Sequence, residues 1–175
     1  MKLRFVPASL LALTGVLFAA MPAASAEADI ALIKGYIGSW RGSGDIVWSD
    51  ANGVPETLQC RMSVQDSDIT KIGVDGRCSL AGGTLSMLGT IAWVDENNRY
   101  EAIVSSNTTF TGIAIGHREG DSLTFDLRDF RANDDSIYDI AADITLAGDT
   151  IQMDMTVTNK QTGDLTTAEI PFERR

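Results

Sequence analysis

Ten short runs of alternating apolar and polar residues constrain the fold of this chain more than any other feature. The first run, Ile37–Trp48, places two tryptophans, Trp40 and Trp48, and two glycines, Gly42 and Gly44, on one face. A period of two puts alternate side chains on opposite faces of a β-strand, so this face is expected to point inward. Glycines between the tryptophans leave room for the large rings and let the strand bend sharply, as small barrels require.

Nine further runs follow, and turn sequences separate them. Two of these connectors, Ala81-Gly82-Gly83 and Ala147-Gly148-Asp149, are typical of hairpins. Short strands joined by tight turns predict an all-β antiparallel meander, which can form either a sandwich or a closed barrel. We favour a single closed barrel of about eight to ten strands. The nine runs are Glu56–Gln65, Ile72–Leu80, Leu85–Trp93, Arg99–Ser105, Thr108–Gly116, Leu123–Asp129, Ile137–Leu146, Ile151–Val157 and Thr166–Phe172.

Residues 1–26 have the features of a secretory signal peptide. A basic stretch precedes an apolar core, Leu10–Ala20, and Ala24-Ser25-Ala26 supplies small residues for cleavage. The apolar core is shorter than the roughly 20 residues that span a membrane, which argues against a transmembrane anchor. We therefore predict export to the periplasm or outside the cell, with a mature single domain at residues 27–175.

The start of the mature chain is predicted to be a short helix, Glu27–Tyr36. Ile30, Ile33 and Ile37 recur at spacings of three and four, and Asp29 is a candidate N-cap. We expect this helix to cover one end of the barrel.

The charge balance of the mature chain limits the classes of partner that it is expected to bind. Removal of Lys2 and Arg4 with the signal peptide leaves 12 basic residues against 24 acidic ones. Such an acidic surface argues against nucleic acid and against anionic membrane faces. Solubility explains the charge without a specific partner, and the sequence leaves the oligomeric state open.

The chain has two cysteines, Cys60 and Cys78, which we predict to form a disulfide. An even cysteine count in an exported protein favours a disulfide, and a metal site would have only one histidine to draw on. Placing the cysteines opposite each other in a hairpin also pairs Met62 with Gly76 and puts the turn at residues 67–71.

No catalytic signature is present, and we interpret the chain as non-enzymatic and without a cofactor. The single histidine, His117, follows an apolar run and is expected to be solvated at a strand end rather than to act as a haem ligand or base. A group of aspartates is expected to form a solvated acidic face, because the spacing of an EF-hand calcium site is missing. These aspartates are Asp126, Asp129, Asp134, Asp135, Asp139 and Asp143.

The predicted inner faces mix aromatic residues, methionines and glycines, a composition typical both of a packed core and of an adaptable pocket. We predict a pocket for a small apolar or amphipathic ligand. Four interior glycines, Gly42, Gly44, Gly89 and Gly112, are expected to leave volume unfilled. The predicted ligand-binding residues are Trp48, Met62, Met87, Trp93, Phe125 and Met155.

The segment Gly38-Ser39-Trp40, after a short helix, resembles the Gly-x-Trp opening of lipocalin-like (calycin) β-barrels. The resemblance implies a container barrel with an arginine of the closing strand over Trp40, a role for Arg174 or Arg175. The same opening is similar to that of nitrobindin-type haem-binding barrels, which place a proximal histidine near the C-terminus, whereas the last run here has none. Small bacterial metalloprotease inhibitors also share a tryptophan-bearing first strand and one cysteine pair.

These observations predict an exported, non-enzymatic binding protein that holds its ligand inside the barrel. Two alternatives are a periplasmic interaction or protease-inhibitor module with a packed barrel, and a haem-binding barrel of the nitrobindin kind. The interior distinguishes them, because it is hollow and apolar in the first case, filled by side chains in the second, and open around His117 in the third.

Overall fold

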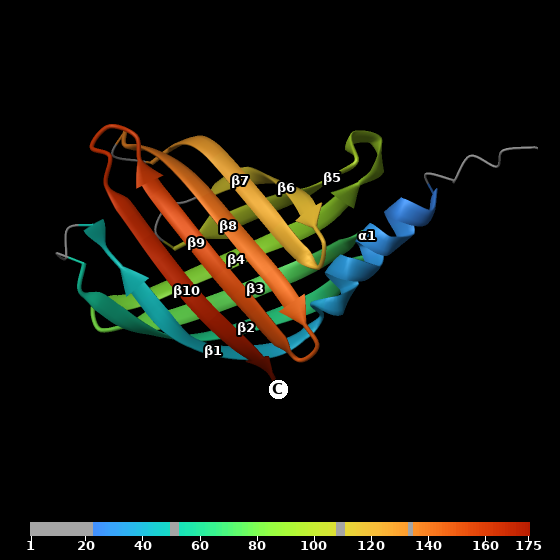
Figure 1. Cartoon of the computed structure of the whole chain (residues 1–175), viewed down its shortest axis with the longest axis horizontal. Helices are drawn as coiled ribbons and strands as arrows, with labels where there is room; N and C mark the ends of the chain where they lie inside the picture. Colours follow the sequence, from blue (N-terminus) through green and yellow to red (C-terminus); the bar gives the residue numbers. More distant parts are fainter. Residues whose placement is uncertain (1–22, 50–52, 108–110, 133–134) are drawn as a thin grey trace, which may run out of the picture.

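The computed structural model describes residues 23–49, 53–107, 111–132 and 135–175. Within these residues one α-helix, α1 (Ala23–Gly35), precedes ten β-strands (Figure 1). A 3₁₀ turn, η2 (Asp95–Asn97), separates the fourth and fifth strands. The strands are β1 (Gly38–Val47), β2 (Pro55–Asp68), β3 (Lys71–Leu80), β4 (Gly83–Val94), β5 (Arg99–Ser106), β6 (Thr111–Glu119), β7 (Ser122–Arg131), β8 (Ile137–Ala147), β9 (Thr150–Asn159) and β10 (Leu165–Arg174).

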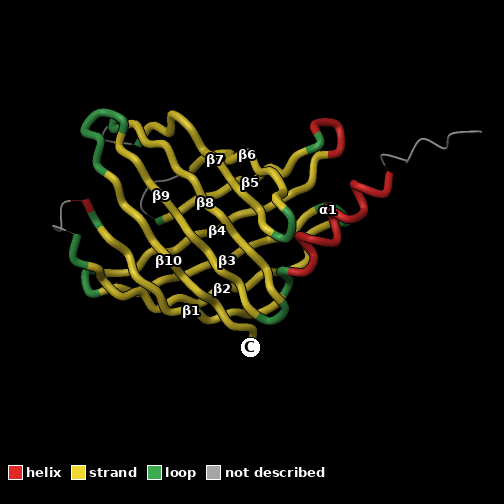
Figure 2. The backbone as a smooth tube through the Cα atoms, in the orientation of Figure 1, coloured by secondary structure: helices red, strands yellow, loops and turns green. Residues whose placement is uncertain are grey.

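The ten strands form a closed antiparallel meander barrel. Each strand pairs with the next one along the chain, and β10 closes the barrel by pairing with β1. Figure 2 shows the strands wound obliquely around a common interior, with α1 at one end. The prediction of an all-β barrel with a short N-terminal helix is therefore confirmed, and so is closure over the alternative of a sandwich.

The disulfide and the register of its hairpin are also confirmed. Cys60 and Cys78 are bonded and stand directly opposite each other on β2 and β3, which places Met62 opposite Gly76. The turn is tighter than expected, because β2 runs to Asp68 and only two residues separate it from β3. A register shift between Asp66 and Asp68 absorbs the extra residue of β2.

The helix begins earlier than the sequence suggested. Because α1 starts at Ala23, Asp29 lies within the helix, and the expectation that it caps the N-terminus is wrong. Its carboxylate instead accepts a hydrogen bond from the Tyr100 hydroxyl of β5, 3.1 Å away. No helix in the described part of the chain is long and apolar enough to cross a membrane.

The interior glycines do not leave volume, which corrects another expectation. A Cβ at Gly42 would lie 2.7 Å from the carbonyl oxygen of Pro171, and one at Gly112 would lie 2.8 Å from Cδ2 of Leu127. Gly44 and Gly89 are likewise crowded by the backbone of the adjacent strand. These glycines allow close approach of neighbouring chain segments, so any hollow must come from the circumference of ten strands.

Candidate functional site: a barrel interior closed at one end

Helix α1 closes one end of the barrel. Ile33 is fully buried and Tyr36 is 4% exposed, and both belong to the hydrophobic core of the barrel. The Tyr36 hydroxyl donates a hydrogen bond of 2.9 Å to the carbonyl oxygen of Ile144 on β8. Burial raises the pKa of Tyr36 to about 12, so its phenol stays protonated and available as a donor at neutral pH.

A small polar network ties the helix to the strands beneath it. The Tyr100 hydroxyl donates to the backbone carbonyl and the carboxylate of Asp29, at 3.0 and 3.1 Å. Arg118 of β6 reaches the same carboxylate at 3.4 Å. Burial, followed by the charge of Asp29, raises the pKa of Tyr100 above its ordinary value. Asp29 is therefore a buried carboxylate with both a hydrogen-bond donor and a cation, as burial of a charge requires.

Arg174 of the closing strand, β10, connects the end of the helix to β1. The Arg174 guanidinium lies 4.1 Å from the centre of the Trp40 ring. It donates to the carbonyl oxygens of Ile37 and Gly35, at 2.6 and 3.1 Å. Trp40 is 1% exposed, and its indole N–H donates to the carbonyl of Tyr36 at 2.9 Å. This is the arrangement that the lipocalin-like opening implied, and Arg174 rather than Arg175 provides the guanidinium.

Above this closed end lies a deep chamber of about 180 Å³. Its walls come from nine of the ten strands and its floor includes Tyr36. Aliphatic, methionine and phenylalanine side chains make up nearly all of the lining, with Ile72, Phe125 and Ile151 among the buried ones. The chamber is therefore apolar and suits a hydrocarbon or aromatic group.

The deep chamber leads into a wider one of about 770 Å³ at the opposite end. Six residues line both chambers and mark the passage between them: Met62, Met87, Val104, Ile140, Met153 and Phe172. Methionine side chains are flexible and polarizable, so this passage adapts to groups of different shape. The interior is thus one hollow with a narrow deep part and a wide outer part.

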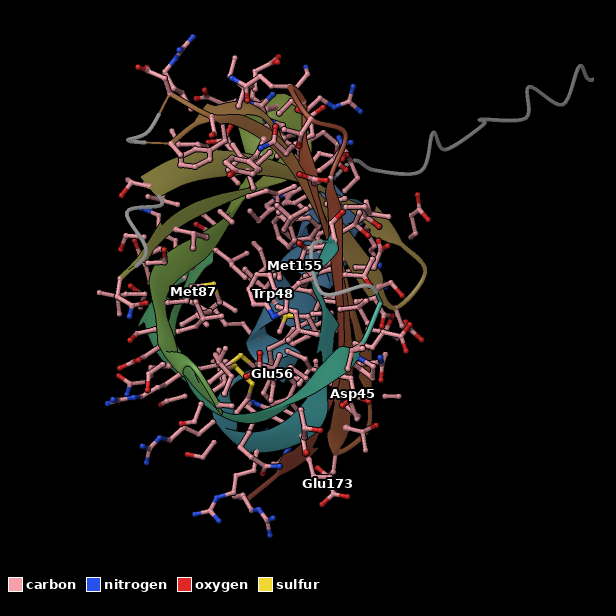
Figure 3. The ribbon with its side chains drawn as sticks, turned by 90° about the vertical axis from the view of Figure 1, so that its left-hand side faces the viewer. Asp45, Trp48, Glu56, Met87, Met155 and Glu173 are labelled. Atoms are coloured by element: carbon pink, nitrogen blue, oxygen red, sulfur yellow. A yellow bond between two sulfur atoms is a disulfide. The ribbon has the colours of Figure 1, made fainter. Side chains whose placement is uncertain are left out.

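The wide chamber opens at the mouth of the barrel. Figure 3 looks toward this end, and the side chains of Trp48, Met87 and Met155 point into the opening, whereas Asp45 and Glu173 lie outside the wall. The indole N–H of Trp48 donates to the Glu56 carboxylate at 3.3 Å. Ser49 and Asp164 are hydrogen-bonded to each other at 3.1 Å and also line the chamber. Apolar walls with a few polar groups at the rim suit an amphipathic molecule.

The structure brings together five of the six residues predicted to bind ligand. Trp48 and Met155 line the wide chamber, Phe125 lines the deep one, and Met62 and Met87 line both. Trp93 lines neither chamber. It is 6% exposed and packs edge-on against Tyr100, with ring centres 5.0 Å apart, near the helix. Its indole nitrogen has no hydrogen-bond partner among the described residues.

His117 is an exposed residue of β6 whose side chain lies on the outer face of the barrel. Its neighbours Gly116 and Ala114 face inward, and alternation along the strand directs His117 outward. The residue is therefore placed within a strand rather than at its end, and it does not line either chamber. Asp134 falls outside the described residues. Among those described, no group of three or more His, Cys, Asp or Glu residues is arranged to hold a metal ion.

Sequence reasoning missed the floor and part of the passage. Tyr36, Ile140 and Met153 line the hollow. The alternation along β8 and β9 was the one signal for Ile140 and Met153, and the position of Tyr36 at the end of a helix was the one signal for that residue. The Asp29–Tyr100–Arg118 network was also missed, because its members lie 71 and 89 residues apart in the sequence.

Comparison with known proteins supports the fold. The S-type phycobiliprotein lyase from Guillardia theta has a TM-score of 0.60 and 11% identity, over 83% of this chain and 91% of that one. The protein Rv2717c from M. tuberculosis has a TM-score of 0.65 and 13% identity, over 84% and 97% of the two chains. Neither the models of protein families nor the curated proteins match the sequence.

The fold and its hollow interior define the class as a closed, lipocalin-like ten-strand barrel. The solved structures share this fold with the chain at low identity, so the likeness is one of architecture. Similarity to nitrobindin-type barrels or to bacterial metalloprotease inhibitors is not shown by these comparisons.

Proposed function

We propose that this chain is an exported, non-enzymatic binding protein that holds a small apolar or amphipathic ligand inside its barrel. The observation that carries the proposal is the continuous hollow, in which a deep apolar chamber of about 180 Å³ opens into a mouth of about 770 Å³. A barrel packed solid would instead have favoured an interaction or inhibitor module.

The shape of the hollow suits a molecule with an apolar end and a less apolar one. The deep chamber would hold the apolar end, and the rim around Trp48 and Asp164 would receive the other. Burial of apolar surface contributes about 25 cal/mol per Å², so a few hundred Å² of ligand surface suffices for binding in the micromolar range.

Export is the second part of the proposal. It rests on the signal-peptide features of residues 1–26, and a disulfide fits an oxidising compartment such as the periplasm. Cleavage before Glu27 would keep Asp29, Ile33 and Tyr36, which fasten the helix to the barrel. The intact mass of the exported protein tests this point, because a retained leader would contradict it.

The binding test uses a series of saturated fatty acids and a hydrophobic dye, with tryptophan and dye fluorescence as readouts. We expect saturable binding that quenches or shifts the emission of Trp48, the tryptophan at the mouth. Replacing Trp48 by Phe removes that response without closing the hollow.

Two neighbouring residues of β4 give a matched pair of variants. Met87 points into the passage, and Leu88 is 62% exposed on the outer wall. Met87→Glu is expected to lower affinity at least tenfold, because a carboxylate in an apolar passage must be desolvated. Leu88→Glu adds the same charge outside and should leave affinity unchanged. Equal affinities for both variants, or no binding by the unaltered protein, would contradict an internal site.

A further inference from the structure

Three arginines form a row on the outer wall of the barrel. Arg41 of β1 stands directly opposite Arg61 of β2, and Arg61 stands directly opposite Arg77 of β3. All three are exposed and alternate with the inward residues Trp40, Met62 and Gly76. Adjacent strands are about 4.8 Å apart, so the three side chains leave the wall within roughly 10 Å of one another.

This arginine row is unexpected in an acidic chain. The formal net charge is −10, with 14 basic residues in the whole sequence, yet three of them stand side by side. Like charges directly opposite each other on a sheet are destabilising. Among the described residues, none of the three has an ion-pair partner within 4.0 Å, although Glu173 faces Arg41 from β10.

The surroundings of the row are rich in hydrogen-bond donors. The outward row on one side consists of Ser39, Ser63 and Asp75, and these residues share a shallow groove of about 700 Å³ with the three arginines and Arg175. On the other side, Gln59 donates to the Ser43 hydroxyl at 2.7 Å. Among the described residues that line the groove, Asp75 has the one acidic side chain, and four guanidinium groups outweigh it.

The disulfide holds two of the arginines in place. Arg61 directly follows Cys60, and Arg77 directly precedes Cys78. The disulfide between the two cysteines therefore fixes β2 and β3 relative to each other at this point. A fixed row of guanidinium forks suits oxyanions, which accept paired N–H donors from each fork.

We propose that the arginine row Arg41–Arg61–Arg77 is a binding site for a polyvalent, phosphate-bearing anion. A phosphate group provides several acceptor oxygens and more than one negative charge, which matches a groove of guanidinium and hydroxyl donors. The exposed arginine side chains alternate with inward residues and line the outer groove, so the proposed site lies on the outer wall, although Arg61 and Arg77 also border the wide chamber.

A second copy of the chain is a weaker candidate for the occupant. A row of carboxylates, Asp143, Asp154, Glu169 and Asp45, crosses β8, β9, β10 and β1 on the outer wall and offers opposite charge. Stable protein interfaces, however, bury about 1,200 Å² or more around an apolar centre. The residues flanking the arginine row are serines and a glutamine, and two convex barrels touch along a narrow strip.

The test measures binding of sodium tripolyphosphate by calorimetry and by the shift in melting temperature, at low ionic strength. We expect the unaltered protein to bind it and to melt at a higher temperature in its presence. The double variant Arg61→Gln, Arg77→Gln should bind at least tenfold more weakly and show no such shift. Without anion it should melt at the same or a higher temperature, because a like-charge pair is removed.

Two controls distinguish binding at the arginine row from a general effect of positive charge on the surface. Arg128→Gln removes one exposed arginine of β7, far from the row in the strand order, and should leave binding unchanged. The pair Arg61→Lys, Arg77→Lys keeps the charge but removes the forks, and it should bind with intermediate affinity.

Vesicles of phosphatidylcholine with phosphatidylglycerol distinguish the two sources of phosphate. Binding to these vesicles without binding to tripolyphosphate, and lost in the double glutamine variant, would assign the row to lipid headgroups. Binding to tripolyphosphate alone would assign it to a soluble anion. Binding to neither, equal binding by the double glutamine variant, or salt-sensitive dimers that depend on Arg61 and Arg77 would overturn the proposal.

Discussion

The two ends of this barrel are built on different principles. At the helix end, Trp40 is 1% exposed and Tyr100 fully buried, and hydrogen bonds to Asp29, Ile37 and Gly35 join helix to strands. At the mouth, Trp48 and Met155 line an open chamber, and Lys160, which follows β9, forms exposed ion pairs with Asp129 of β7 and Asp139 of β8. The helix end therefore buries its side chains, whereas the mouth leaves the interior of the barrel accessible to a ligand.

This difference implies that the stability of the fold depends mainly on one end of the barrel and ligand binding mainly on the other. Side chains near α1 are buried and most of their polar groups are hydrogen-bonded, the indole N–H of Trp93 excepted, whereas those at the mouth leave space that a ligand can take. Substitutions at the helix end should therefore change the free energy of unfolding, and substitutions at the mouth should mainly change affinity.

Replacing Trp40 of β1 and Trp48, which directly follows β1, in turn gives the sharpest comparison. Trp40→Ala is expected to lower the free energy of unfolding by about 3–5 kcal/mol, because it removes a buried ring and the surface on which Arg174 lies. Trp48→Ala should cost less than about 1 kcal/mol, because the ring is only partly buried. Urea denaturation of both variants measures this difference, and similar costs would show that the two ends are not distinct.

Removing the disulfide should weaken the wall of the open half. Cys60 and Cys78 close a loop with a sequence separation of 18, and the chain-entropy model gives about 3 kcal/mol for such a loop. Cys78 also lines the wide chamber. For the Cys60→Ala, Cys78→Ala variant we expect faster amide exchange in β2 and β3 near the mouth than near α1. Uniform acceleration along both strands would contradict this division.

Much of the fold could be predicted from the sequence because its signals are local. Period-two alternation lies within each run of residues, and the cysteine pair sets the register of β2 against β3. That register also places Arg61 opposite Arg77, so the arginine row was available from the sequence in part. The net negative charge of the whole chain did not reveal the arginine row, because a net charge does not show how charged residues are arranged on the strands.

The errors concern packing between segments far apart in the chain. Trp93 is buried as expected, but it packs edge-on against Tyr100 and lies outside the hollow. Gly112 was expected to leave volume, yet the side chain of Leu127 from the next strand takes that space. Alternation shows which side a residue faces, and only the full barrel shows what it meets there.

High pH should loosen the helix end before the mouth. The pKa of Tyr36 is raised from 10.0 to about 12, so the fold favours the neutral phenol. Its contribution to stability is present in full below pH 10 and is lost as the pH rises toward 12, with a limit of about 2–3 kcal/mol. Tyr36→Phe should cost about 1 kcal/mol at pH 7 through the lost bond to Ile144, and make the decline above pH 10 shallower. Unfolding measured from pH 8 to 11.5 tests this, and an unchanged decline would assign it to Tyr100 or another group.

The smallest effect is expected at Asp129 on the rim of the mouth. Asp129 has a φ of 54° beside a register shift in β7, and its carboxylate pairs with Lys160. The pairing lowers the pKa of Asp129 and raises that of Lys160, but both groups are exposed and salt screens them. Asn also tolerates a positive φ, whereas a β-branched residue does not. Asp129→Asn should therefore leave the melting temperature nearly unchanged at physiological salt, and Asp129→Val should lower it measurably. If Asp129→Asn lowered it as much as Asp129→Val, the ion pair rather than the backbone would hold this part of the rim, and charge would contribute to the mouth as burial does to the helix end.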